Sequence, residues 1–237
     1  MKLSAPIYQL KRRAKLMARD QKIALHTALD RIASEEGFTT WSLLSARAAL
    51  RSTPREMLAR LADGDLLLLG ARPGHGKTLL GLQLLLDAVH QGRRGVFFTL
   101  EYTEQETRER IRLLEDKASD LGGALEIVIS DDICADYIIS HLAGAPPGTV
   151  ATVDYLQILD QKRNKPELSE QISALRAFAR QTGVILAFIS QIDRSYSPDT
   201  KPLPDIQDIR LPNRLDVTLF SKACFLHDEK MQFQAIA

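Results

Sequence analysis

Residues 66–79 read Leu-Leu-Leu-Leu-Gly-Ala-Arg-Pro-Gly-His-Gly-Lys-Thr-Leu, which joins a short apolar run to a glycine-containing loop and the start of a helical pattern. Gly74 and Gly76 allow the backbone to turn so that its amides point at phosphate oxygens, and the dipole of the following helix adds positive potential. Lys77 supplies a cation for the β and γ phosphates of a nucleotide, and the Thr78 hydroxyl can coordinate Mg²⁺. The stretch has the pattern of a P-loop with Ala71 in place of the usual first glycine. It predicts a nucleoside triphosphate site formed by Arg72, Pro73, Gly74, His75, Gly76, Lys77 and Thr78, in which His75 is expected to face solvent without a catalytic role.

Short apolar runs recur after this stretch and alternate with helical patterns. Strands are predicted at 66–70, 96–100, 125–129, 150–154, 184–190 and around 217–226. Helices are predicted at 77–91, 104–120 and 167–182, the second capped by Thr103 and Glu106 and the third ended by Gly183. Near-continuous apolar strands separated by helices indicate parallel strands that are buried on both faces. The sequence therefore predicts an α/β fold with a mostly parallel central sheet covered by helices on both faces.

Two carboxylates stand at the ends of predicted strands. Asp154 ends the apolar run 150–154, the form of a Walker B strand, and its position beside the P-loop predicts a ligand of the Mg²⁺ shell. Glu101 follows the run 96–100 and precedes a capped helix. It qualifies as the base that orients water onto the γ phosphate, although an isolated glutamate at a strand end is more often simply solvated.

Several segments, in this order, resemble the ATPase domain of DnaB-type replicative helicases, which belongs to the RecA-like group. Besides the P-loop at 71–78, they are Thr99-Leu100-Glu101-Tyr102-Thr103 with Arg110 nine residues after the glutamate, Asp131-Asp132, Val153-Asp154-Tyr155-Leu156-Gln157, Ser190-Gln191-Ile192-Asp193-Arg194-Ser195, and Asp208-Ile209-Arg210. The resemblance covers about residues 56–229. It implies a RecA-like P-loop domain that binds ATP and Mg²⁺.

The resemblance also implies roles for individual residues. Glu101 would be the catalytic base, Lys77 a catalytic cation, and Gln191 the sensor that couples the γ phosphate to a DNA-binding loop at 194–210. Within that loop Arg194, Lys201 and Arg210 would contact phosphates of single-stranded DNA without reading bases. Ordinary solvated charges are the alternative for these three cations. The family also implies a homo-oligomer with nucleotide sites at subunit interfaces.

Some features depart from the family pattern. The basic cluster that normally reaches a neighbouring subunit's nucleotide is expected beyond 225–229 and is not found in the given sequence, and the residues 211–218 differ from the family's acidic stretch. Two functions therefore remain open: an ATP-hydrolysing, DnaB-like helicase or DNA-associated motor, and a nucleotide-switched adaptor or loader with slow turnover and no unwinding. A RecA-like ATPase acting on protein is a weaker third.

The amino-terminal part of the chain has a different pattern. Residues 1–60 hold twelve Lys and Arg against five Asp and Glu, a balance of +7, whereas the whole 237-residue chain has a net charge of +1. The pattern of apolar residues at 5–50 predicts helices, and Thr53 and Glu56 form a capping box at the start of the next one. We therefore divide the chain into a basic helical module at 1–52 and the ATPase domain at 53–237. The positive charge indicates either a polyanionic partner or a solvated helix face.

Composition excludes several classes of protein. Hydrophobic residues make up 45% and charged residues 26% of the chain, which argues against disorder. The longest apolar runs fall far below the roughly 18 residues of a membrane-spanning helix. Early basic residues leave no room for a signal peptide, and Cys134 and Cys224 have neither metal nor disulfide spacing. We therefore expect a cytoplasmic protein without a membrane partner.

Overall fold

The computed structural model describes residues 3–5, 7–45, 57–115, 122–160, 165–198, 201–210, 215–227 and 230–236. Its centre is a seven-stranded sheet of order β3-β2-β4-β5-β1-β6-β7. The strands are β1 (Leu66–Ala71), β2 (Gly95–Thr99), β3 (Leu125–Ile129), β4 (Val150–Asp154), β5 (Ile185–Gln191), β6 (Lys222–His227) and β7 (Lys230–Ala235). All neighbouring pairs are parallel except β6 and β7. The predicted α/β fold with a mostly parallel sheet is confirmed.

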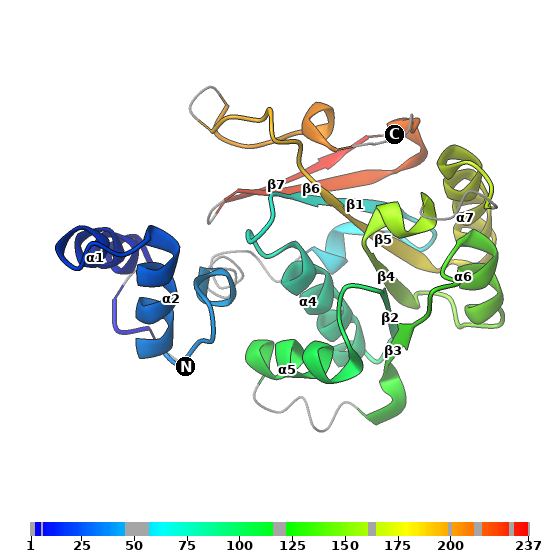
Figure 1. The fold of residues 1–237 in the computed structure, drawn as a ribbon. Coiled ribbons are helices and arrows are strands. Elements are labelled where there is room, and N and C mark those ends of the chain that lie inside the picture. The colour runs from blue at the N-terminus through cyan, green and yellow to red at the C-terminus, as the bar shows by residue number, and fades with distance from the viewer. Residues whose placement is uncertain are drawn as a thin grey trace.

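Helices cover both faces of this sheet (Figure 1). On one face lie α4 (Lys77–His90) and α5 (Glu104–Leu114), and on the other α6 (Ala135–His141) and α7 (Leu168–Thr182). The α5 helix begins with the predicted capping box of Thr103 and Glu106, and α7 ends at Gly183 in the left-handed conformation. These local signals explain why α5 begins and α7 ends where the sequence predicts.

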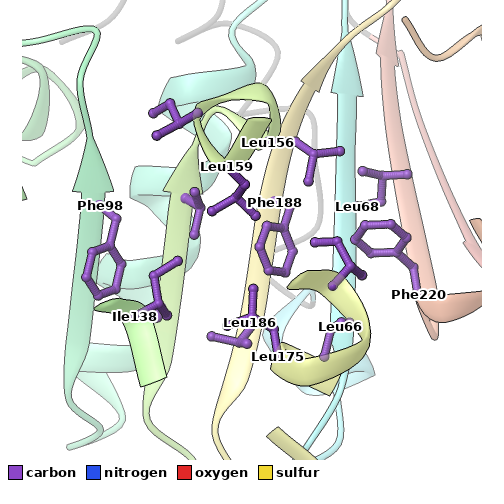
Figure 2. Packing of buried hydrophobic residues seen from close by; sticks show 14 of the residues in the cluster. Leu66, Leu68, Phe98, Ile138, Leu156, Leu159, Leu175, Leu186, Phe188 and Phe220 are labelled. Carbon is purple, nitrogen blue, oxygen red and sulfur yellow. The ribbon is translucent and has the colours of Figure 1, made fainter. Parts of the chain in front are cut away.

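Alternate residues of each strand face two separate cores. On the α6 and α7 side, Figure 2 shows Leu175 of α7 next to Leu66 and Leu186 of the sheet, and Ile138 of α6 beside Phe98. The intervening residues, among them Leu67, Leu69, Phe97, Ala187 and Ile189, pack against α4. Because side chains along a strand alternate between faces, runs that are apolar at every position belong to a sheet covered on both sides.

Four details of the fold differ from the sequence-based expectations. The helix predicted at 104–120 ends at Leu114, because Glu115 is extended. The run expected around 217–226 divides into a 3₁₀ turn at Val217–Leu219 and β6. Neither α6 nor the antiparallel edge strand β7 was predicted. Both elements are short, and β7 alternates polar with apolar residues instead of forming an apolar run.

The amino-terminal module has its own small core. Helices α1 (Ile7–Asp20) and α2 (Leu25–Glu35) pack together and are followed by a short helix at 41–45. Buried residues include Leu10 and Ala14 of α1 with Ile32 of α2, whereas Leu25 at the start of α2 is 42% exposed. The domain boundary predicted at 52 and 53, with its capping box, lies outside the described residues. Within the described parts of the chain no helix is long and apolar enough to cross a membrane.

Candidate nucleotide site at the carboxyl edge of the sheet

The predicted site residues meet at one edge of the sheet. Strand register places Ala71 of β1 opposite Gln191 of β5, and Asp154 of β4 opposite Thr99 of β2. Glu101 follows Thr99 by two residues, and its amide donates to the Thr99 hydroxyl at 3.1 Å. Because the carboxyl ends of parallel strands lie together, residues far apart in sequence converge beside the P-loop.

The P-loop links β1 to the amino terminus of α4. Gly74 and Gly76 have φ angles of 80° and 85°, in the left-handed region that glycine adopts without strain. The α4 helix then begins at Lys77, so its first amides, which have no partner within the helix, face the loop. Lys77 and Thr78 are both buried, at 8% and 7% exposed. This arrangement of amides, helix dipole and ammonium suits a phosphate group.

Asp154 and Thr78 form a pair that fits a magnesium ion. The Thr78 hydroxyl donates to Asp154 Oδ2 at 2.7 Å, and the buried Asp154 Oδ1 meets no hydrogen-bond donor among the residues that the structure describes. Burial raises the pKa of Asp154 to about 6, against the opposing effects of the Lys77 charge and the Thr78 hydrogen bond. An orphaned carboxylate oxygen beside a hydroxyl offers the hard oxygen ligands that Mg²⁺ prefers. Among the described residues no group of three or more His, Cys, Asp and Glu side chains is gathered for a metal, so the nucleotide and water would complete the shell.

Glu101 lies on the other side of Lys77. Its Oε2 is 3.7 Å from Lys77 Nζ, and its side chain is 27% exposed. The next residue, Tyr102, is covered by Arg110, whose guanidinium carbon lies 3.8 Å from the ring centre. Glu101 is therefore close to the lysine ammonium and still accessible to water.

The segment 192–210 leaves β5 next to the P-loop and returns to the same place. Ile192 and Ile209 form an antiparallel bridge, and the Arg210 amide donates to the Gln191 carbonyl at 2.8 Å. Gln157, three residues after the end of β4, contacts the point where this segment returns: its Nε2 donates to the Arg210 carbonyl at 2.8 Å. The sequence analysis placed Gln157 in a motif and gave it no role. In the structure it is a half-buried residue of a 3₁₀ turn at Leu156–Asp160, and its polar character among apolar neighbours was the available signal.

Arg72 belongs to the P-loop by its backbone, but its side chain points to the 192–210 segment. The guanidinium donates to the carbonyl oxygens of Arg194, at 3.3 Å, and of Tyr196, and it lies 5.3 Å from the centre of the Tyr196 ring. Its five donors in a planar fork suit this double contact. The side chain therefore ties the phosphate loop to the neighbouring segment.

The three expected DNA-contacting cations have different surroundings. Arg194 and Arg210 are exposed. Lys201 instead pairs with Asp205 at 2.5 Å and Asp208 at 2.7 Å. Burial lowers the pKa of Lys201, but the hydrogen bonds and charges of the two aspartates outweigh it and raise the pKa overall. In this structure Lys201 stabilises the segment internally.

His75 is half-buried instead of facing solvent as expected. Its ring stacks on that of His227, at the end of β6, with 4.9 Å between centroids, and the Tyr196 ring meets His227 edge-on at 5.4 Å. The aromatic contacts were not predictable because they join three segments distant in sequence. They add a second link between the P-loop and the 192–210 segment.

A cavity of about 590 Å³ opens beside the P-loop. Its walls come from Gly74 and 76–79 of the P-loop and α4, from the α5 region including Tyr102 and Arg110, and from the module residues Thr39, Thr40, Ser42 and Leu43. Its volume lies within the range of small-molecule sites. The cavity therefore extends the phosphate site toward α5 and the module.

Comparison with known proteins agrees with this geometry. The replicative DNA helicase DnaB of Mycoplasma pneumoniae is 26% identical over 186 residues, covering 62% of this chain and 39% of that protein. A probable plasmid replicative DNA helicase of Chlamydia muridarum is 25% identical over 194 residues, covering 68% of this chain and 43% of that protein. Over its ATPase region, the chain is a distant homologue of the DnaB-like replicative helicases. The chain spans about two fifths of the length of these curated relatives.

The fold of the DnaB-like region is also shared with a solved structure. A DnaB-like replicative helicase, described with its interactions with primase, has a TM-score of 0.57 at 17% identity, covering 94% of this chain and 68% of that chain. At that identity the match establishes a common α/β fold like that of RecA-like ATPase domains. No family model matches the chain. Distant DnaB-like homology implies nucleotide binding at the P-loop.

Proposed function

We propose that the protein is an ATP-hydrolysing, DnaB-like DNA helicase or DNA-associated motor, which binds Mg-ATP at 72–78 and single-stranded DNA through the 194–210 loop. One observation carries this proposal: the Thr78–Asp154 pair, Lys77 and Glu101 lie side by side at one sheet edge. Each group suits a different part of a triphosphate. The distant DnaB-like homology supports the same assignment.

Each residue has a role that follows from its chemistry. Lys77 neutralises charge on the β and γ phosphates. Thr78 and Asp154 hold Mg²⁺, which when bound offsets phosphate charge and orients the triphosphate. Glu101 accepts a proton from the attacking water, to which its partial exposure gives it access, and its Oε2 lies 3.7 Å from Lys77 Nζ.

Gln191 and the 194–210 loop would couple nucleotide to DNA. Gln191 ends β5 beside the P-loop strand, and its carbonyl accepts the Arg210 amide, so a change at the γ phosphate has a short path to the loop. Arg194 and Arg210 are exposed and available for phosphates of single-stranded DNA. Lys201 would reach a phosphate only by breaking its ion pairs with Asp205 and Asp208, so we assign it a smaller contribution to DNA binding than Arg194 and Arg210.

Steady-state ATPase with and without single-stranded DNA tests the proposal. We expect DNA to stimulate the wild-type rate at low salt, and Lys77→Ala to abolish nucleotide binding or turnover while the fold remains intact. Wild-type ATPase in Lys77→Ala would overturn the nucleotide assignment. An ATPase indifferent to DNA would favour the nucleotide-switched adaptor or loader. Mass photometry with ATP and DNA tests the proposed homo-oligomer in the same samples.

A further inference from the structure

The amino-terminal module forms part of the wall of the nucleotide cavity. Thr39, Thr40, Ser42 and Leu43 line the same cavity as Lys77 and Thr78. Figure 1 shows the short helix that carries Ser42 and Leu43 between α2 and α4. Residues of the module thus come within reach of a ligand whose phosphates lie at the start of α4.

Two contacts dock the module at this point. Leu43 packs against both the module core and the core on the α4 face of the sheet. Ser42 Oγ lies only 3.1 Å from the position that a Cβ on Gly74 would occupy, so the hydroxyl packs directly on the turn of the P-loop. The start of the short helix is fixed within the module, since the Trp41 amide donates to Asp30 Oδ1 at 2.8 Å. Residues 39–43 are therefore held by contacts to the module on one side and to the P-loop and the core on the α4 face on the other.

The walls of the cavity differ in chemistry, and the α5 wall carries the charged residues Glu106, Glu109, Arg110 and Arg112. The P-loop end offers amides and the Lys77 ammonium, which suit phosphates. The wall formed by Thr39, Thr40 and Ser42 carries hydroxyls and no charge, which suits the ribose and the base. A volume of about 590 Å³ leaves room beyond a triphosphate. Uncharged hydroxyls that face the same cavity as the P-loop suit the ribose hydroxyls and ring nitrogens of the uncharged half of a nucleotide.

Resting on the proposed function, we infer that Thr39, Thr40 and Ser42 contact the nucleoside half of the bound nucleotide, so that the amino-terminal module completes the ATP site. The phosphates are held by the P-loop alone. The module then senses whether a nucleoside, and not only a phosphate chain, occupies the cavity. Trp41, the only tryptophan of the chain, lies within this segment and reports on its surroundings.

The first experiment needs no substitution. Tryptophan emission of the full chain is recorded while ATP with Mg²⁺ is titrated to saturation. We expect the emission of Trp41 to change with the same affinity that calorimetry gives for ATP. Unchanged emission at saturating ATP overturns the inference.

The second experiment compares ATP with inorganic tripolyphosphate, which has no nucleoside. In the variant Thr39→Ala/Thr40→Ala/Ser42→Ala we expect ATP to bind about tenfold more weakly, as two or three lost hydrogen bonds imply, and tripolyphosphate to bind as in the wild type. All three positions are exposed. Because Thr40→Ala also removes the hydroxyl that accepts the Leu43 amide at 3.3 Å, a circular dichroism melt verifies that the variant folds. The matched control is Ser34→Ala, an exposed serine of the same module that does not line this cavity.

The outcomes separate this inference from the proposed function. Wild-type affinity for ATP in the triple variant overturns the inference, and so does an equal loss for ATP and tripolyphosphate, because the module would then act only through the P-loop. Lys77→Ala serves as the reference for the phosphate end. If Lys77→Ala retains both ligands, the proposed nucleotide site itself is wrong; if it loses both while the triple variant loses neither, only the inference fails.

Discussion

The side-chain amide of Gln157 donates a hydrogen bond to the main-chain carbonyl oxygen of Arg210 at 2.8 Å. Gln157 lies three residues after Asp154, and Arg210 closes the 192–210 segment. The same amide is 3.4 Å from the Ser190 hydroxyl, at the end of β5. The Gln157 side chain therefore contacts both chain segments that enter and leave the 192–210 segment, and it follows the strand that ends in Asp154.

We predict that Gln157→Leu uncouples DNA from hydrolysis. Leucine keeps the approximate volume but removes the donor, so ATP affinity should stay within about twofold of wild type, while DNA stimulation of the ATPase is lost. Stability should fall by about 1 kcal/mol, the usual effect of one hydrogen bond. Gln207→Leu, at an exposed position of the same segment, is the control. Full stimulation in Gln157→Leu would rule out this route.

Arg72→Lys separates two roles for the arginine. A lysine retains the charge but has no planar fork for two carbonyls, so the contacts to Arg194 and Tyr196 weaken. We expect unchanged calorimetric affinity for ATP and reduced stimulation by DNA. A loss of ATP affinity with intact stimulation would instead return Arg72 to the phosphate-binding set.

Glu101→Gln should bind Mg-ATP and lose turnover by at least about 10²-fold, as expected when a general base is neutralised. Binding is followed by calorimetry and turnover by phosphate release. The comparison variant is Asp154→Asn, which should weaken the dependence of ATP binding on Mg²⁺. If Asp154→Asn stops hydrolysis and Glu101→Gln does not, the base has been misassigned.

Asp154 predicts a pH dependence of stability in the absence of nucleotide. Burial raises its pKa to about 6 from 3.8, so between these values the native state binds more protons than the unfolded state. The free energy of unfolding then falls as pH rises through this window, by up to about 1.4 kcal/mol per pH unit, and the penalty stays constant above it. Asp154→Asn removes the buried charge and should melt at a higher temperature than wild type near neutral pH. The difference should shrink toward pH 4, and a variant less stable than wild type at neutral pH would contradict the prediction.

The loop cations should differ in their effect on DNA binding. If Arg194 and Arg210 each meet one phosphate, replacing either with Ala should flatten the plot of log affinity against log salt by roughly 0.7. Lys201→Ala should change this slope much less, because its ammonium already pairs with Asp205 and Asp208. Fluorescence anisotropy with labelled single-stranded DNA at several salt concentrations measures the slopes. Equal slopes in all three variants would mean that Lys201 leaves its aspartates on binding.

Most strands and long helices followed from local sequence signals. Apolar runs bounded by polar residues located β1 to β5 within about a residue, and the Thr103 capping box and Gly183 located helix ends. The ends of parallel strands then predicted that Glu101 and Asp154 lie beside the P-loop, the family resemblance implied the same for Gln191, and the structure brings all three there. Their catalytic and binding roles remain predictions.

Other features depend on contacts between distant segments and could not be read locally. The Arg72 side chain points to the 192–210 segment because it donates a hydrogen bond to the Tyr196 carbonyl and lies near the Tyr196 ring. His75 is partly covered because His227 ends beside it. The placement of Ser42 on Gly74 joins segments of different pattern. Local periodicity carries no information on such pairings.

The bridge between Ile192 and Ile209 fixes the two ends of the intervening segment against each other and against β1. For a loop anchored in this way, doubling its length costs only about 0.6 kcal/mol of closure free energy. Insertions, deletions or wholesale exchange between these two isoleucines thus leave Gln191 and the sheet edge in place. Evolution or engineering can reshape the tip of this segment while the sheet edge beneath it keeps its arrangement.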